Sequence, residues 1–324
     1  MKAIVFNEIG RPLDVLQVKE IEKPQPKKGE ALIRMTAASI NPGDFLFMQK
    51  LYPAPKWPVF PDQIAGNHGA GIIEEFAGPS NLKAGMFVAF SYYNTWAEYA
   101  SVPMEWLIPL PADYALEKAG QLVNVISAYD LLEKSGVQKG EWLALSAANS
   151  TISTMIAQFA REKGVKVISI ARKINPEMDL KELGSTVVLE SSVAGLKKKI
   201  NEITEEQGLK GFIDHVGGPV TGEVIRSMAF GGKVVINGVM SEENYQLHNL
   251  DILMSGIEIA SYVYRYFFDS PTSADKAFLE QLIRISHQPT FKIPVAKLFK
   301  IEQYREAVQD TLEQPEKGKR LFRL

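Results

Sequence analysis

The clearest pattern in the chain is an apolar run at residues 142–148, followed by a short polar turn and an amphipathic segment. Apolar residues recur every three or four positions across residues 152–159, which is typical of a helix with one buried face. Gly164 ends this segment, and residues 165–170 form a second run rich in β-branched side chains. Strand, helix and strand within about thirty residues predict a βαβ unit with parallel strands and a right-handed crossover.

The turn between the first strand and the helix has an unusual composition for a phosphate-binding loop. A helix N-terminus offers unpaired N–H groups and the positive end of a dipole, which suit a pyrophosphate. Yet no glycine lies between Gly140 and Gly164, so the glycine-rich phosphate fingerprint is absent. The stretch by itself leaves two interpretations open. It is either a nucleotide site built from Ala, Asn, Ser and Thr, or a βαβ unit that binds no nucleotide.

The pattern changes twice along the chain. Residues 1–112 contain short alternating runs separated by Pro and Gly, which predicts a β-rich domain. Residues 113–284 alternate strands and helices, which is typical of a doubly wound parallel sheet. Residues 285–324 return to strand–helix–strand character, and we expect this tail to rejoin the first domain. The predicted fold class is therefore α/β, with a smaller β-rich domain beside the doubly wound one.

Composition narrows the function classes. The chain has 324 residues and a net charge of −2 with both signs interspersed, so no basic footprint for nucleic acid is present. No apolar run reaches the roughly 18 residues that a membrane span requires. From the strand-like segment at residues 2–6 we expect no signal peptide. The sequence has no cysteine, which excludes disulfides and thiolate chemistry. We expect a cytoplasmic protein that acts on a small molecule.

A family resemblance rests on short segments whose order and spacing run through the whole chain. The segments are SINPGD (39–44), LYP (51–53), GNHGAG (66–71), TWAEY (95–99), LVN (122–124), AANS (147–150), HVGG (215–218) and INGVMS (236–241). Together they resemble the medium-chain dehydrogenase/reductase superfamily, in particular its zinc-independent 2-enoyl thioester reductases and quinone oxidoreductases. The resemblance implies a GroES-like catalytic domain and a Rossmann-type nucleotide domain.

The sequence can be examined for the zinc ligands of this superfamily. Alcohol dehydrogenases of this superfamily bind a catalytic zinc with Cys, His and Cys. The resemblance implies that Asn41, Asn67 and Asn124 occupy the corresponding positions here. Neutral amides are poor zinc ligands. His68 is adjacent to one of these positions, but a single histidine is more typical of a hydrogen-bonded structural residue. We expect no bound metal.

Cofactor preference follows from the end of the second strand of the βαβ unit. NAD-binding proteins place an acidic residue there for the ribose hydroxyl, whereas this chain has Arg172 and Lys173. A guanidinium can bind a 2′-phosphate, so NADPH is favoured over NADH, unless these bases only form a solvated loop. The cofactor-binding residues that the resemblance implies are Asn124, Asn149, Ser150, Thr151, Ile152, Arg172, Lys173, Val216, Gly217, Asn237 and Gly238. Residues 151–153 replace the expected Gly-Val-Gly, which could weaken that binding.

Chemistry without a metal requires a positioned proton donor. By resemblance, Tyr52 matches the tyrosine that acts as the acid in enoyl thioester reductases, and Asn41 lies near the nicotinamide end. Hydride from NADPH would reach the β-carbon of an unsaturated carbonyl, and a phenol with a pKa near 10 could protonate the product. Alternatively, Tyr52 only packs among its prolines, with Tyr92 and Tyr93 as substitute donors.

The sequence therefore predicts an NADPH-dependent, zinc-independent reductase of activated double bonds. A quinone oxidoreductase, which needs no proton-donating tyrosine, is the alternative enzyme. A catalytically silent nucleotide sensor or scaffold is the alternative of another class, because of the missing glycines. The family, together with an edge strand expected at residues 257–264, favours a homodimer.

Overall fold

The computed structural model describes residues 1–79, 81–192 and 195–324. The chain forms two compact units, one made of Met1–Val123 with Tyr266–Leu324 and the other of Asn124–Arg265. The first unit therefore joins both ends of the chain, and the second is a continuous insertion. The domain bounds predicted from the sequence, 1–112 plus 285–324 and 113–284, stay a prediction.

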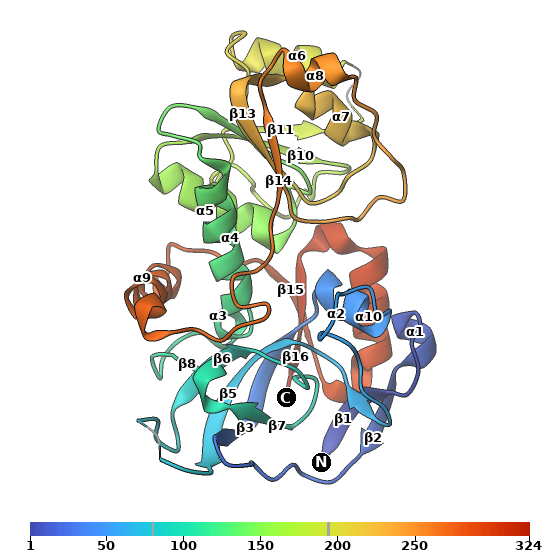
Figure 1. The fold of residues 1–324 in the computed structure, drawn as a ribbon, viewed down its shortest axis with the longest axis vertical. Coiled ribbons are helices and arrows are strands. Elements are labelled where there is room, and N and C mark those ends of the chain that lie inside the picture. The colour runs from blue at the N-terminus through green and yellow to red at the C-terminus, as the bar shows by residue number, and fades with distance from the viewer. Residues whose placement is uncertain (80, 193–194) are drawn as a thin grey trace. The chain divides into compact units, whose positions relative to one another are not determined.

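The first unit is built on two sheets (Figure 1). The strands of the larger sheet, in spatial order, are β15 (Val295–Phe299), β16 (Lys319–Arg323), β3 (Glu30–Ser39), β5 (His68–Phe76), β6 (Phe87–Ser91) and β8 (Ile108–Pro109), and β7 (Tyr99–Pro103) also pairs with β3. The smaller sheet has the order β2 (Gln17–Glu20), β1 (Lys2–Phe6) and β4 (Gln63–Ile64). Antiparallel pairing of β16 with β3 sets Leu321 opposite Ser39, so the C-terminal tail completes the N-terminal sheet.

Close packing between β3 and β5 explains the run of glycines at the start of β5. A Cβ atom at Gly71 would lie 2.3 Å from the carbonyl oxygen of Arg34, so a larger residue would push the two strands apart. β3 is buried at most of its positions, because sheet neighbours and apolar side chains cover both of its faces.

Short helices interrupt the β-rich unit. They are α1 (Pro12–Val15), α2 (Pro42–Met48), α3 (Leu116–Ala119), α9 (Lys276–His287) and α10 (Tyr304–Glu313), with 3₁₀ turns η1 (Met104–Trp106), η2 (Ser273–Asp275), η3 (Ile301–Gln303) and η4 (Pro315–Lys317). The sequence Asn-Pro-Gly-Asp at residues 41–44 is typical of a turn, but in the structure this segment begins α2. Asn41 and Asp44 form a reciprocal capping box, and Pro42 occupies the first helical position, where its missing N–H costs nothing.

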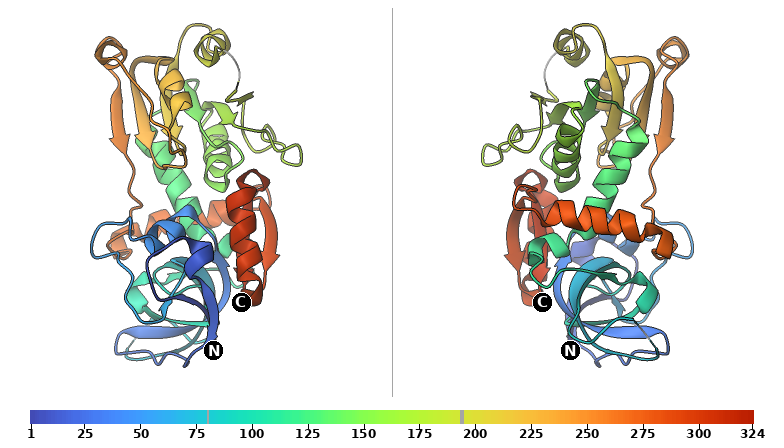
Figure 2. Two further views of the ribbon diagram at one scale, coloured as in Figure 1. Left: turned by 90° about the vertical axis from the view of Figure 1, so that its right-hand side faces the viewer. Right: turned by 90° about the vertical axis from the view of Figure 1, so that its left-hand side faces the viewer.

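The second unit is a six-stranded parallel sheet. Its spatial order is β11 (Val187–Glu190), β10 (Lys166–Ala171), β9 (Trp142–Leu145), β12 (Leu209–Asp214), β13 (Met228–Ile236) and β14 (Glu258–Ser261). Its helices, seen on both sides of the sheet in Figure 2, are α4 (Leu122–Ser135), α5 (Thr151–Glu162), α6 (Leu196–Ile203), α7 (Pro219–Ile225) and α8 (Asn249–Leu253). In chain order the strands are arranged 3-2-1-4-5-6, so the order reverses between β9 and β12. Ligands of such sheets bind at the carboxyl ends of the strands beside this reversal.

Two predicted helices have different bounds in the structure. The sequence pattern of residues 116–136 predicts one helix, but the structure divides this segment into α3 and α4. The pattern of residues 220–229 also predicts a helix, which in the structure ends at Ile225. Met228 already begins β13. The pattern does not mark this boundary, because the segments before and after it are both apolar and periodicity alone does not separate them. Among the described residues, β14 is the strand at one end of this sheet. Pairing of two copies of the chain along β14 stays a prediction.

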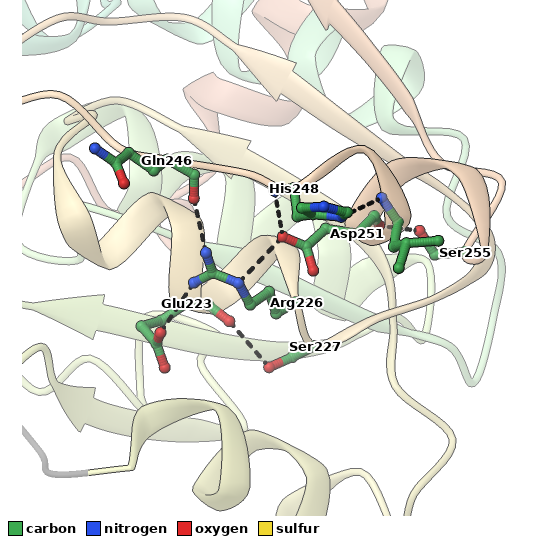
Figure 3. Close-up of polar contacts among 8 residues, drawn as sticks. Glu223, Arg226, Ser227, Gln246, His248, Asp251 and Ser255 are labelled. Atoms are coloured by element: carbon green, nitrogen blue, oxygen red, sulfur yellow. Dashed lines mark hydrogen bonds and ion pairs between the residues drawn. The ribbon is translucent and has the colours of Figure 1, made fainter.

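A cluster around Arg226 fastens the long connection between β13 and α8 to the rest of the unit (Figure 3). Arg226 caps the C-terminus of α7, and its guanidinium donates to the carbonyl of Gln246 at 2.7 Å and to the carboxylates of Glu223 and Asp251 at 3.1 and 3.3 Å. Asp251 also accepts from the backbone N–H of His248, which caps α8. The connection that follows Gly238 is therefore held at its far end.

No helix within residues 1–79, 81–192 and 195–324 is both long and apolar enough to cross a lipid bilayer.

Candidate active site

Asn41 lies at the centre of a buried polar cluster in the first unit. Its side-chain amide contacts the hydroxyl of Ser39 at 2.8 Å and Nδ1 of His68 at 3.1 Å. Its carbonyl oxygen accepts from the ammonium of Lys319 at 2.7 Å. Because the amide donates to His68, Nδ1 of that ring is the acceptor and its proton resides on Nε2. Three segments far apart in the chain therefore meet at one asparagine.

The neighbouring Asp44 carboxylate is fully buried and accepts three hydrogen bonds. Its oxygens accept from the backbone N–H of Asn41 at 2.8 Å, the backbone N–H of Asn67 at 2.9 Å and the Asn67 amide at 3.0 Å. Burial raises the pKa of Asp44 to about 6, while these N–H donors and the charge of Lys319 oppose the rise. Burial likewise lowers the pKa of Lys319 to about 8, against the charge of Asp44. Asp44 and Asn67 together position the loops that carry Asn41 and His68.

Stability should depend on pH through Asp44. Its pKa is higher in the folded chain than in the unfolded one, so the folded state binds more protons between about pH 4 and pH 6. The contribution of Asp44 to the free energy of unfolding is therefore present below pH 4 and declines as the pH rises to 6, by at most about 3 kcal/mol. The Asp44→Asn variant, followed by urea denaturation from pH 4 to 7, should lack this decline. Parallel curves for both proteins would contradict it.

His68 and the zinc-ligand positions of related enzymes do not assemble a metal site. Burial first, and then the charges of Lys56 and Lys319, lower the pKa of His68 to about 3, so the ring is neutral. Within the described parts of the chain, no three His, Cys, Asp or Glu side chains come together as metal ligands do. Asn41 and Asn67, at two of the positions that correspond to zinc ligands, are instead engaged in hydrogen bonds with protein groups.

Tyr52 lies against the start of α2 and is the candidate proton donor. Its ring packs edge-on against Phe267 with 4.9 Å between the centroids. A Cβ atom at Gly43 would lie only 2.5 Å from the Tyr52 hydroxyl, so the glycine makes room for the phenol. Burial first, and then the Asp44 charge, raise the pKa of Tyr52 above its ordinary value of 10. The phenol is therefore protonated throughout the physiological range and adjoins the Asn41 cluster.

The first turn of α5 explains how a loop without glycine is built. Ser150 caps the helix by accepting from the backbone N–H of Ser153 at 3.2 Å. The Ser153 hydroxyl donates to the carbonyl of Ser146 at 2.9 Å, so its added side chain is satisfied inside the unit. As the first helical residues, Thr151 and Ile152 have no intrahelical acceptor for their N–H groups, which suits an anionic ligand.

Asn149 ties this loop to the segment with the two bases. Its amide donates to the carbonyl of Lys173 at 2.6 Å and accepts from the backbone N–H of Asn175 at 3.2 Å. Arg172 and Lys173 are exposed. Neither forms an ion pair or side-chain hydrogen bond within the described residues. Asn149 therefore acts here as a positioning residue, and the two cations are available for an anion.

Asp214, at the end of β12, is the hub of the second unit and was not predicted. Its Oδ1 accepts from the hydroxyl of Ser146 at 2.7 Å and the N–H of Val216 at 3.0 Å. Its Oδ2 accepts from the N–H of Gly217 at 3.1 Å and the hydroxyl of Thr221 at 2.7 Å. The carboxylate thus joins β9 to the turn after β12, at the reversal of strand order.

The predicted pairs 216–217 and 237–238 meet beside this hub. The N–H groups of Asn237 and Gly238 both donate to the carbonyl of Asp214, at 2.8 and 3.2 Å. The Asn237 amide contacts Nδ1 of His215 at 2.8 Å. A Cβ atom at Gly238 would lie 2.3 Å from the His215 carbonyl, so this position requires glycine. His215 is buried and its pKa is lowered to about 4 by that burial, so the ring is neutral.

The predicted site residues therefore fall into one cluster in each unit. Asn41 and Tyr52 adjoin the start of α2. In the second unit, a hydrogen-bonded path runs from the 149–153 loop through Ser146 and Asp214 to the 216–217 turn. Asn124 is buried at the start of that unit. Sequence reasoning missed Asp44, Lys319 and Asp214. The only signal for Asp214 was an acid at the end of an apolar strand.

Comparison with known proteins identifies the family. Residues 27–112 match the alcohol dehydrogenase GroES-like domain, and residues 151–279 match the zinc-binding dehydrogenase family. The mitochondrial enoyl-[acyl-carrier-protein] reductase of Rattus norvegicus is 30% identical over 254 residues, which cover 75% of this chain and 67% of that protein. The chain belongs to the medium-chain dehydrogenase/reductase superfamily. The predicted α/β class, with a GroES-like domain and a Rossmann-type sheet, is thereby confirmed.

Solved members of this superfamily share the whole fold. The quinone oxidoreductase of Escherichia coli, solved in complex with NADPH, has a TM-score of 0.88 and 20% identity, and the match covers 100% of both chains. The Etr1p complex with NADP and crotonyl-CoA has a TM-score of 0.85 and 21% identity, over 100% of this chain and 99% of that one. One matched family is described as zinc-binding, whereas the resemblance implies amide side chains, those of Asn41, Asn67 and Asn124, at the positions of the zinc ligands.

Proposed function

We propose that this superfamily member reduces the activated carbon–carbon double bonds of 2-enoyl thioesters, enones or enals, with Tyr52 as the proton donor. The protein is an NADPH-dependent oxidoreductase, in keeping with its enoyl reductase relatives. The substrate class and the proton donor are the proposed part. When bound, NADPH supplies the hydride for the β-carbon of the double bond.

The observation that carries the proposal is the placement of Tyr52. A phenol that remains protonated at neutral pH can donate its proton to the substrate as negative charge develops on the enolate. Phe267 packs edge-on against the ring, and Tyr52 is partly buried. Asn41 and His68 hold a fixed, neutral polar surface beside the start of α2, which suits a carbonyl or amide group of a ligand.

The residues of the second unit fit a phosphorylated dinucleotide. The free N–H groups at the start of α5 suit the pyrophosphate, and Arg172 and Lys173 suit the 2′-phosphate. The buried Asp214 carboxylate accepts from the backbone N–H groups of Val216 and Gly217 and so fixes the 216–217 turn beside the proposed cofactor site. Asn149, through its bond to the Lys173 carbonyl, keeps the basic segment beside the phosphate loop.

Removal of the Arg172 charge should change cofactor preference. Because a hydrogen bond to a charged group contributes about 1.5–3 kcal/mol, Arg172→Ala should weaken NADPH binding by roughly 10- to 100-fold. NADH has no 2′-phosphate, so its affinity should be unchanged. Quenching of tryptophan fluorescence measures both affinities, and Arg161→Ala on α5 is a control that removes a cation elsewhere in the unit. Tighter binding of NADH than NADPH by the unaltered protein would contradict the role of Arg172.

A substrate panel tests the proposed function against its alternatives. NADPH oxidation is measured with crotonyl-CoA, with a simple enone and with a quinone. Turnover of the first two supports the proposal. Turnover of the quinone alone favours the quinone oxidoreductase, which the likeness to the Escherichia coli enzyme supports. Absence of NADPH binding at millimolar concentration would favour a catalytically silent protein, which the glycine-free loop motivates.

A further inference from the structure

Lys56 has surroundings that the proposed reaction does not explain. Its ammonium lies over the ring of Tyr93, 4.5 Å from the centroid, and 5.4 and 5.6 Å from the rings of Phe267 and Trp106. The side chain is partly buried, and this burial lowers the pKa of Lys56 to about 8. Aromatic faces attract a cation, but they replace only part of its hydration.

No acidic group of the described residues compensates this charge. Within the part of the chain that the structure describes, Lys56 makes neither an ion pair nor a hydrogen bond to a side chain. The ammonium therefore retains three unused donors in a partly desolvated, aromatic-lined place. A charge in that state is stabilised when an anion enters, and an anionic oxygen gains more from the contact than a neutral carbonyl does.

Lys56 also lies close to the candidate proton donor. Tyr52 and Lys56 belong to the same loop and contact the same ring, that of Phe267. The charge of Lys56 is near enough to His68 to lower the pKa of that histidine. The ammonium therefore adjoins both parts of the proposed site in the first unit, namely the Tyr52 phenol and the Asn41–His68 pair.

We propose that Lys56 is a specificity-determining residue that receives a carboxylate of the substrate. This inference rests on the proposed function and adds a preference within it, for α,β-unsaturated ketones or aldehydes that bear a carboxylate close to the double bond. Tyr93, Trp106 and Phe267 form the apolar wall around the ion pair, which keeps water from competing for it. Lys56 takes no part in hydride or proton transfer.

A matched pair of substrates tests the role of Lys56. The acid 4-oxo-2-pentenoate and its methyl ester contain the same double bond and differ in the negative charge. The unaltered protein should have the higher kcat/KM for the acid. Lys56→Gln should lower kcat/KM for the acid by roughly 10- to 100-fold, the effect of losing a charge-assisted hydrogen bond, and should leave the ester within about 2-fold. Lys56→Arg should retain most of the preference.

Lys50→Gln is the control variant, because Lys50 precedes the same loop and also lies over a ring, 4.3 Å from that of Trp57. It should leave both substrates unaffected, and thermal unfolding of all variants verifies that they fold. Equal loss for acid and ester in Lys56→Gln would overturn the inference, because a structural role would affect both. So would equal kcat/KM for acid and ester in the unaltered protein.

A binding measurement separates this inference from the proposed reductase function. The saturated acid 4-oxopentanoate is titrated by calorimetry into the protein, with and without NADP⁺. If neither unsaturated compound is reduced, the reductase proposal for this class fails. Weaker binding of 4-oxopentanoate by Lys56→Gln than by the unaltered protein then still supports the anion-binding role. Equal binding, or none by the unaltered protein, overturns it.

Discussion

Tyr52→Phe should lower kcat for crotonyl thioester reduction by about 10²- to 10⁴-fold, the range that a positioned general acid contributes. The Tyr52 ring packs against Phe267, and its hydroxyl lies in the space left by Gly43. The ring of the substituted phenylalanine should therefore occupy the same space, and the fold should be unaffected. KM for the thioester and NADPH affinity should change little. Single-turnover oxidation of NADPH, recorded in a stopped-flow instrument, separates the chemical step from binding.

Two comparisons make this result decisive. Tyr92→Phe removes a second phenol of the same unit whose pKa is also raised by burial, and it should leave crotonyl turnover unchanged. Quinone reduction, which needs no carbon protonation, should survive in Tyr52→Phe. Unchanged crotonyl turnover in Tyr52→Phe would rule out the acid role, and a loss in Tyr92→Phe instead would move the role to that residue. Because the pKa of Tyr52 lies above its ordinary value, its ionisation should not limit the wild-type rate below about pH 10.

The sequence predicted the second unit well because its signals are local. The apolar strand, the amphipathic helix and the second strand predicted within residues 142–170 appear in the structure as β9, α5 and β10. Their order in the sheet follows from the alternation of strands and helices. The basic pair at 172–173 was found because it directly follows a strand. Each of these features depends on residues that are neighbours in the chain.

The first unit was predicted less completely, because its site depends on contacts between distant segments. Lys319 contacts Asn41 across 278 residues of sequence, and no local pattern indicates that pair. The start of α2 at Asn41 was missed because Pro-Gly also indicates a turn, and the capping bond from Asp44 decided between them. Lys56 was missed because the rings around it come from three separate segments.

The missing glycines now have a physical account. Ser153 adds a hydroxyl where the family has glycine, but that hydroxyl donates to the Ser146 carbonyl, so the helix need not leave the sheet. Ala147 adopts a φ of +50°, which favours glycine and strains an alanine. The loop is thus held by hydrogen bonds of the side chains of Ser150 and Ser153. The interpretation of residues 147–153 as a nucleotide loop is strengthened by this.

Asp214→Ala should strongly destabilise the second unit. The carboxylate is buried and is the shared acceptor for Ser146, Val216, Gly217 and Thr221. Its removal leaves several buried donors unsatisfied, so the free energy of unfolding should fall by about 3–5 kcal/mol. Urea denaturation measures the loss. The exposed Asp113→Ala is the control and should change stability by less than about 0.5 kcal/mol.

A graded companion variant distinguishes the network from simple burial. Thr221→Val keeps the shape of the side chain but removes one donor to the carboxylate, so it should cost about 1.5–3 kcal/mol. NADPH affinity should fall in Asp214→Ala, because the 216–217 turn loses its anchor, and remain nearly unchanged in Thr221→Val, where the backbone N–H bonds persist. If Asp214→Ala unfolds as readily as Asp113→Ala, the carboxylate is not the hub of this sheet edge. If stability falls while NADPH affinity is retained, the turn after β12 does not contribute to the cofactor site.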